Sequence, residues 1–157
     1  MNTYTVSFFG HRDFCEHHKC EEKLEEIIRS AISSHKYVNF LVGRNGKFDI
    51  FVSSVIKRIK KEREEDYFIN LTLVLPYITS EFKNNEDYFE KYYDNIEICP
   101  ASELAHFKSA ITLRNRKMID RSNLVVCFVS KQTGGAASAT KYAQSTGKTV
   151  INLFKVF

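Results

Sequence analysis

The chain has 157 residues, of which 43% are hydrophobic and 27% are charged, and this balance excludes a disordered, collagen-like or coiled-coil protein. A domain of this length buries roughly 70% of the surface that its unfolded chain exposes, so the sequence supports a core of its own. The net charge of +4 comes from 23 basic and 19 acidic residues that are largely intermixed, as in VIKRIKKEREED. Nucleic acid is therefore not an expected partner, because its binders usually gather Lys and Arg on one patch.

The amino-terminal stretch MNTYTVSFFGHRDF has no basic leader, and its apolar run stops after Phe9. No segment approaches the roughly 18 uninterrupted apolar residues of a membrane span. We therefore expect a cytoplasmic protein without a membrane partner. The four cysteines, Cys15, Cys20, Cys99 and Cys127, are predicted to be reduced thiols rather than disulfides.

Hydrophobic periodicity predicts alternating strands and helices over the first half of the chain. Residues 3–9 form a short apolar and β-branched run that ends at Gly10. Residues 20–35 and 48–59 carry apolar side chains at spacings of three and four, which is typical of amphipathic helices. Between them, residues 37–42 read as a strand that ends at the glycine-rich GRNG.

The second half continues this alternation after one irregular segment. LTLVL is a strand closed by Pro76, whereas residues 77–99 are expected to be rich in loops, with a short helix at EDYFEKYYDN. Two further helices and two further strands then alternate; they are predicted at residues 103–121, 123–129, 135–146 and 149–154.

Alternation of this kind implies parallel strands joined by crossover helices. The predicted fold is a single α/β domain over residues 1–157, a Rossmann-like three-layer sandwich with a mostly parallel sheet of about five strands. In such sheets ligands bind at the carboxyl ends of the strands. The tail VINLFKVF ends on apolar residues, which is compatible with a homodimer formed through the edge of the domain that the tail itself provides.

The loops expected at the carboxyl ends of the strands are small or basic. Glycine lets backbone N–H groups approach an anion, and a following helix adds the positive end of its dipole, so Gly134 and Gly135 are predicted to bind phosphate. Ser138 or Thr140 could add a hydroxyl contact; alternatively, the glycines only form a tight turn. Arg12 is predicted to contact the phosphate, whereas His11 either contacts it or caps the sheet edge through backbone hydrogen bonds.

Neither glycine-rich loop matches a common nucleotide motif. GRNGKFD lacks the Gly-Lys-Ser/Thr ending of a P-loop, and no GxGxxG follows the first strand. A kinase-like NTPase and an ordinary NAD dehydrogenase therefore lose support, and no cofactor is expected. CEHHKC, residues 15–20, contains two Cys and two His, but its adjacent histidines suit one tetrahedral zinc ion poorly, so no metal is expected.

Five segments in register resemble the SLOG superfamily, the Rossmann-like group that includes the lonely-guy phosphoribohydrolases and the DprA recombination mediators. The segments are FFGHRDF, LVGRNGKFDIFVSSVIKRIKKE, LVLPY, AITLRNRKMIDRSNLVVCFV and TGGAASATKYAQSTGK. The sequence is most similar to small bacterial and phage members that begin with a GHR motif, and the likeness covers essentially the whole chain.

This resemblance implies a nucleotide-binding domain with AMP-like or ADP-ribose-like ligands. Gly43, Gly46 and Asp49 match the family's glycine-rich loop and its acidic residue. Arg114 and Asn115 match an Arg-Asn pair that faces the ligand cleft, and Gly134 and Gly135 match the glycines of the PGG-type motif.

One departure from the family concerns catalysis. In the phosphoribohydrolases the motif continues as GGxGTxxE, and Lys141 stands where its Glu would be. A lysine cannot act as the carboxylate that assists cleavage of the N-glycosidic bond. Because Asp49, Asp94 and Glu103 remain as other carboxylates, enzymatic activity stays an open question.

The function expected from the sequence is the sensing or sequestering of a nucleotide-derived small molecule. Glycines would cradle its phosphate, arginines would neutralise it, and Asp or Asn side chains would bind ribose or base. The first alternative is a nucleotide or N-glycosidic-bond hydrolase, and the second is a DprA-like single-stranded DNA-binding module. The predicted ligand-binding residues are His11, Arg12, Gly43, Arg44, Gly46, Asp49, Asp94, Arg114, Asn115, Gly134, Gly135 and Ser138.

Overall fold

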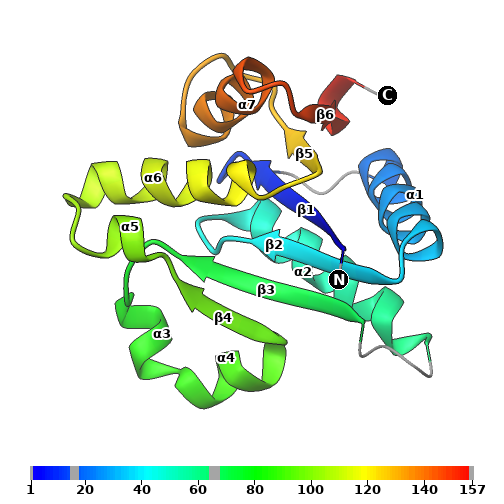
Figure 1. Ribbon diagram of the computed structural model, residues 1–157, viewed down its shortest axis with the longest axis horizontal. Helices are drawn as coiled ribbons and strands as arrows, with labels where there is room; N and C mark the ends of the chain where they lie inside the picture. The colour runs from blue at the N-terminus through cyan, green and yellow to red at the C-terminus, as the bar shows by residue number, and fades with distance from the viewer. Residues whose placement is uncertain (1, 15–17, 64–67, 156–157) are drawn as a thin grey trace.

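A six-stranded, entirely parallel sheet forms the centre of the computed structural model, which describes residues 2–14, 18–63 and 68–155 (Figure 1). The strands lie in the order β4-β3-β2-β1-β5-β6. Each neighbouring pair is parallel, as the crossover rule for alternating elements requires. The strands are β1 (Thr3–Gly10), β2 (Tyr37–Val42), β3 (Ile69–Leu75), β4 (Asn95–Ile98), β5 (Leu124–Phe128) and β6 (Thr149–Asn152).

Helices cover both faces of the sheet and bury a separate core on each. Successive side chains of a strand point to opposite faces, so Phe8 packs in the larger core and the neighbouring Phe9 in the smaller one. The larger core lies under α1 (His18–Ser34) and α2 (Lys47–Lys61). The smaller core lies under α6 (Phe107–Asp120) and α7 (Gly135–Ser145).

The predicted fold class is confirmed, with one strand more than expected. The apolar stripes predicted for the first two helices are buried in α1 and α2. The additional strand is β4, which lies inside the segment predicted to be rich in loops. No described helix is long and apolar enough to cross a lipid bilayer. The described cysteines, Cys20, Cys99 and Cys127, are buried free thiols.

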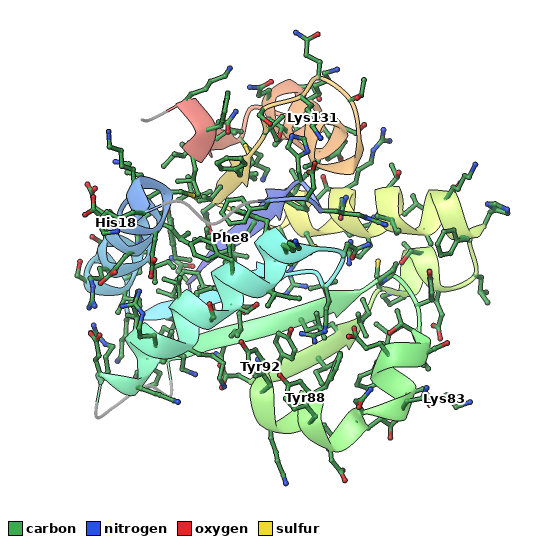
Figure 2. All side chains as sticks on the ribbon, turned by 180° about the vertical axis from the view of Figure 1, so that it is seen from behind. Phe8, His18, Lys83, Tyr88, Tyr92 and Lys131 are labelled. Atoms are coloured by element: carbon green, nitrogen blue, oxygen red, sulfur yellow. The ribbon has the colours of Figure 1, made fainter. Side chains whose placement is uncertain are left out.

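The irregular segment before β4 contains two short helices, α3 (Ser80–Asn84) and α4 (Glu86–Tyr92). Thr79 caps α3 by accepting the N–H of Phe82 at 3.1 Å. Of the aromatic side chains in α4 and after it, Phe89 and Tyr93 are buried in the larger core. Figure 2 shows Tyr88 and Tyr92 at the end of the molecule opposite Lys131, which lies beside α7.

The helix predicted at residues 103–121 begins four residues later than expected, at Phe107. A short helix, α5 (Pro100–Glu103), precedes α6 and is held to the end of β3 by a hydrogen bond of 2.6 Å from Ser102 Oγ to the carbonyl of Pro76. Leu104 follows α5 and is 97% exposed, so it belongs to a turn and not to the buried stripe of α6. The helix α6 begins at Phe107, and His106 Nδ1 accepts the N–H of Lys108 at its amino end.

Candidate functional site

A pocket of about 480 Å³ opens at the carboxyl edge of the sheet, where β1 and β5 lie side by side. The chain leaves these neighbouring strands toward opposite faces, into α1 and α7, so this is the topological switch point at which ligands of open α/β sheets bind. The loops after β1, β2 and β5 and the inner face of α6 form its walls. Of the predicted residues, those that line it are His11, Arg12, Asp49, Arg114, Asn115, Gly134 and Gly135.

The amino end of α7 faces the pocket through two glycines. Gly134 has φ of +100°, a left-handed conformation that favours glycine, so the turn itself requires this residue. Gly135 has no such constraint, and a Cβ at either position would meet no described atom within 4 Å. The first N–H groups of a helix have no intrahelical partner and carry the positive end of its dipole. The structure therefore places an unobstructed anion-binding end of a helix at the pocket.

The hydroxyl groups predicted to assist these glycines lie elsewhere. Ser138 is exposed and does not line the pocket, although its N–H donates to the carbonyl of Gly134 at 3.0 Å. Thr140 Oγ1 donates to the carbonyl of Ala136 at 2.8 Å within the same helix. Any contact from α7 to a ligand in the pocket would thus come from backbone N–H groups.

The two glycines of GRNG pack against other residues of the protein and do not border the pocket. A Cβ at Gly43 would stand 3.1 Å from Arg114 Nη1 and 3.2 Å from Asp49 Oδ2. A Cβ at Gly46 would stand only 2.5 Å from the Cα of Arg12. Neither glycine lines the pocket. Their role in this structure is to let the loops after β1 and β2 and the helix α6 approach one another closely.

A buried arginine braces the floor of the pocket. Arg114 is only 3% exposed, and its Nε donates to Asn115 Oδ1 at 2.9 Å. Its Nη1 donates to the carbonyl of Val74 at 2.8 Å, and its Nη2 donates to Asn45 Oδ1 at 3.1 Å. One guanidinium thereby ties α6 to the end of β3 and to the loop after β2.

Asp49 supplies a buried carboxylate beside this arginine. Its Oδ2 accepts the N–H of Asn45 at 2.9 Å. Burial raises the pKa of Asp49, because the charged form loses its hydration, while the Asn45 hydrogen bond and the positive charge of Arg114 act in the opposite direction. Burial likewise lowers the pKa of Arg114, and the carboxylate of Asp49 opposes that change. The two side chains therefore favour each other's charged form at the floor of the pocket.

Two cations stand at the rim. Arg12 is exposed, and its guanidinium makes no hydrogen bond or ion pair within the described part of the chain. Lys131 Nζ pairs with Asp13 Oδ2 at 2.9 Å, and the two side chains are 59% and 70% exposed. Water screens an exposed pair of this kind, so the pair adds little to stability and Lys131 can exchange its carboxylate for a bound anion at little cost.

His11 lines the pocket but acts as an acceptor for the backbone. Its Nε2 accepts the N–H of Ser130 at 3.0 Å and that of Lys131 at 3.2 Å. A nitrogen that accepts two hydrogen bonds carries no proton, so this network assigns a neutral ring with its proton on Nδ1. Burial, and then the charge of Lys131, lowers the pKa of His11. This arrangement matches the capping role that was one of the two predicted for His11.

Two predicted ligand contacts point to other parts of the molecule. Arg44 forms an ion pair with Glu81 at 2.9 Å, donates to the hydroxyl of Tyr93 at 3.0 Å and lies over the ring of Phe89 at 4.7 Å. Asp94 precedes β4 at the amino edge of the sheet, where it accepts hydrogen bonds from Lys60 Nζ at 2.6 Å and from the N–H of Leu71 at 2.7 Å. Neither residue lines the pocket.

Several pocket residues were absent from the sequence prediction. Asn45 and Asp13 are immediate neighbours of predicted residues, so the loops had been identified but not every side chain in them. Lys131 follows β5 by three residues, and its position at a strand end was the only signal for it. Ile111 supplies an apolar wall from α6.

Lys141 does not line this pocket. Its Nζ donates to the carbonyl of Gln132 at 3.2 Å, and its side chain lines a neighbouring groove on the other side of α7. Within the described ranges, no group of three His, Cys, Asp or Glu side chains could hold a metal ion. Residues 15–17, the first half of the CEHHKC motif, lie outside those ranges.

No protein-family model and no curated protein matches the sequence. Solved structures do match. One is DNA processing protein A (DprA) from Streptococcus pneumoniae, with a TM-score of 0.62 and 15% sequence identity; the match covers 94% of this chain and 49% of the DprA chain. Another is DprA from Helicobacter pylori, whose structure concerns its single-stranded DNA binding mode; it has a TM-score of 0.62 and 16% sequence identity, and the match covers 94% of this chain and 63% of that DprA chain. This chain thus spans about half to two thirds of these proteins. At such identity the likeness shows a shared Rossmann-like fold, and membership of the SLOG superfamily stays a prediction.

The expectation that nucleic acid is not a partner is contradicted by these neighbours, since both are DNA-processing proteins and one was solved for its single-stranded DNA binding mode. The physical error lay in using net charge. A value of +4 averages acidic and basic residues over the whole surface, whereas the carboxyl edge of the sheet brings Arg12, Arg114 and Lys131 together in one pocket.

Proposed function

We propose that this pocket binds backbone phosphates of single-stranded DNA. The observation that carries the proposal is the unobstructed amino end of α7 at Gly134 and Gly135, in a pocket whose rim carries Arg12 and Lys131. The fold shared with the DprA proteins, one of which is described by its single-stranded DNA binding mode, supports the same conclusion.

The chemistry of the pocket suits a phosphodiester. Phosphate oxygens in protein–DNA complexes are bound by backbone N–H groups, helix amino ends and Arg or Lys side chains. All three are present here. The amino end of α7 supplies backbone N–H groups, and the loops after β1 and β5 supply the side chains of Arg12 and Lys131. Because these groups recognise the backbone and not the base edges, we expect binding with little sequence preference and a strong dependence on salt.

A nucleotide-derived small molecule is the second candidate for the same pocket. The polar side chains at its floor, Asn45, Asp49 and Asn115, are more than a backbone phosphate needs and could hydrogen-bond a ribose or a base. The volume of about 480 Å³ also falls in the range of small-molecule sites. This candidate and the first share the phosphate subsite and differ in whether a single nucleotide suffices.

Binding of a labelled oligothymidylate, followed by fluorescence anisotropy, tests the first candidate, and thermal shift with AMP and ADP-ribose tests the second. Gly135→Asp is the sharpest variant, because the new side chain has space and an acidic residue in the first turn favours the helix while repelling phosphate. We expect at least a tenfold loss of affinity. Gly135→Asn, of equal size but neutral, is the matched control and should lose much less.

Arg12→Gln provides an independent variant on the opposite side of the pocket, with Lys117→Gln on the exposed face of α6 as its control for total charge. Arg12→Gln should weaken binding severalfold and Lys117→Gln should not. Unchanged DNA affinity in both Gly135→Asp and Arg12→Gln would exclude this pocket as the phosphate site. Tight binding of AMP or ADP-ribose together with no DNA binding would favour the second candidate.

A further inference from the structure

A second groove, of about 570 Å³, lies between α7 and the outer strand β6 and adjoins the first pocket at Lys131. Lys131 lines both cavities, so the loop after β5 forms the ridge between them. Figure 1 shows α7 and β6 side by side near the carboxyl end of the described chain.

The groove concentrates positive charge. Lys131, Lys141 and Lys155 line it, and none of its described lining residues is an Asp or a Glu. This composition differs from that of the whole chain, in which 23 basic residues are nearly balanced by 19 acidic ones. The carboxylate that pairs with Lys131, that of Asp13, lines the first pocket and not this groove.

Lys141 extends the row of positively charged side chains from the first pocket into the groove. Its Nζ donates to the carbonyl of Gln132, the residue directly after Lys131, at 3.2 Å. A cation from α7 therefore stands beside the ridge that carries a cation from the loop. A glutamate at position 141 would interrupt this line of positive charge, whereas a lysine extends it.

The groove also offers an aromatic surface. Phe154 is 43% exposed and lines the groove together with the half-buried side chains of Val150 and Ile151. The ring of Phe128 packs against that of Phe154, with centroids 5.7 Å apart and planes at 77° to each other. Aromatic rings beside a line of cations form the usual platform for single strands, because unpaired bases stack on the rings while phosphates meet the cations.

We infer that the groove between α7 and β6 binds the continuation of the strand whose phosphate occupies the first pocket. The strand crosses the ridge at Lys131, its next phosphates meet Lys141 and Lys155, and a base stacks on Phe154. This inference rests on the proposed function and extends it, because it assigns a path longer than one nucleotide and requires bases that are free to unstack.

Two oligothymidylates of different length distinguish binding in the groove from binding in the pocket. One has about 4 nucleotides and the other about 16, the span of site sizes seen for single-strand binders. In the wild-type protein the longer one should bind at least tenfold more tightly. In the variant Lys141→Gln/Lys155→Gln most of this gain should be lost while affinity for the short one is kept. The glutamine at 141 removes the charge and keeps a polar side chain at this position.

The dependence of affinity on salt gives a second readout. Removal of two phosphate contacts should reduce the slope of log affinity against log salt for the longer oligonucleotide by about 1.4, since each contact to a single strand contributes about 0.7. Phe154→Ala should lower the affinity for the longer oligonucleotide with little change in the salt slope, because this substitution removes a stacking surface and no charge. Lys117→Gln/Lys148→Gln removes the same charge outside the groove and is the matched control.

The outcomes distinguish the two proposals. If Lys141→Gln/Lys155→Gln keeps the full gain from length, or if the control variant loses as much, the path through the groove is wrong while binding in the first pocket stands. If the wild-type protein binds the short and the long oligonucleotide equally, the groove adds nothing and the inference is also wrong. If it binds neither, the proposed function is wrong and the inference fails with it.

Discussion

Gly43 lies directly against the guanidinium of Arg114, so that a Cβ on the glycine would stand 3.1 Å from Nη1 and 3.3 Å from Cζ. The guanidinium cannot move away from such a Cβ without losing hydrogen bonds, because it donates to Asn115, to Val74 and to Asn45. The glycine thus serves the packing of a buried charge behind the pocket, and it does so through its small size.

Gly43→Ala should therefore lower the free energy of unfolding by about 1–3 kcal/mol, the usual cost of overpacking a well-packed site. Urea denaturation of the two proteins measures the difference. Gly135→Ala, where no described atom lies within 4 Å of the new Cβ, is the control and should not lower stability. Equal stability of Gly43→Ala and wild type would mean that Arg114 is free to move.

Arg114→Ala should be among the most destabilising single changes in the chain, at about 3 kcal/mol or more, because it leaves the buried carboxylate of Asp49 without its nearby cation. It also removes the donors that hold Asn45 and the carbonyl of Val74. If this mechanism holds, adding Asp49→Asn should recover part of the loss, and a double-mutant cycle in urea should give a clear coupling energy. Strict additivity of the two changes would show that the side chains act independently.

The adjacent glycines at α7 should respond in opposite directions to alanine. Gly134 has φ of +100°, so Gly134→Ala should cost about 1–3 kcal/mol in backbone strain. Gly135 lies in the first turn of the helix without a positive φ, and Gly135→Ala should raise stability by about 0.4–1 kcal/mol by restricting the unfolded chain. Thermal denaturation of both variants tests this contrast, and destabilisation of equal size would refute it.

The fold followed from the sequence because buried parallel strands and amphipathic helices leave strong patterns. The run from Thr3 to Phe9 and the apolar stripe of α1 are dictated by burial on the two sides of the sheet. The strand β4 was missed because it has four residues, NIEI, at the outer side of the sheet, and none of them is fully buried. A short, half-exposed strand differs little from a loop in composition.

The position of the candidate site also followed from the sequence, but several side-chain directions did not. Strand ends locate Arg12 and Gly134 at one edge whatever the details of packing. Arg44, by contrast, is drawn away by Glu81 and Tyr93. Those partners belong to a segment whose structure the sequence left open, so the direction of Arg44 depended on contacts that local pattern could not predict. Lys131 was missed for a related reason, because its place between two cavities depends on the path of the loop.

His11 should make stability fall on the acid side. Its folded-state pKa is lowered from the 6.5 of an unperturbed histidine, mainly by burial, and protonation of Nε2 would displace the N–H groups of Ser130 and Lys131. A group whose pKa is lowered by folding contributes its full stabilisation above its unfolded pKa and loses it as the pH falls through the folded value. Between about pH 7 and pH 5 the wild-type protein should therefore lose more stability than His11→Gln, which cannot titrate there. Urea denaturation across this range measures the difference, and parallel curves for the two proteins would show that His11 does not hold the loop after β5.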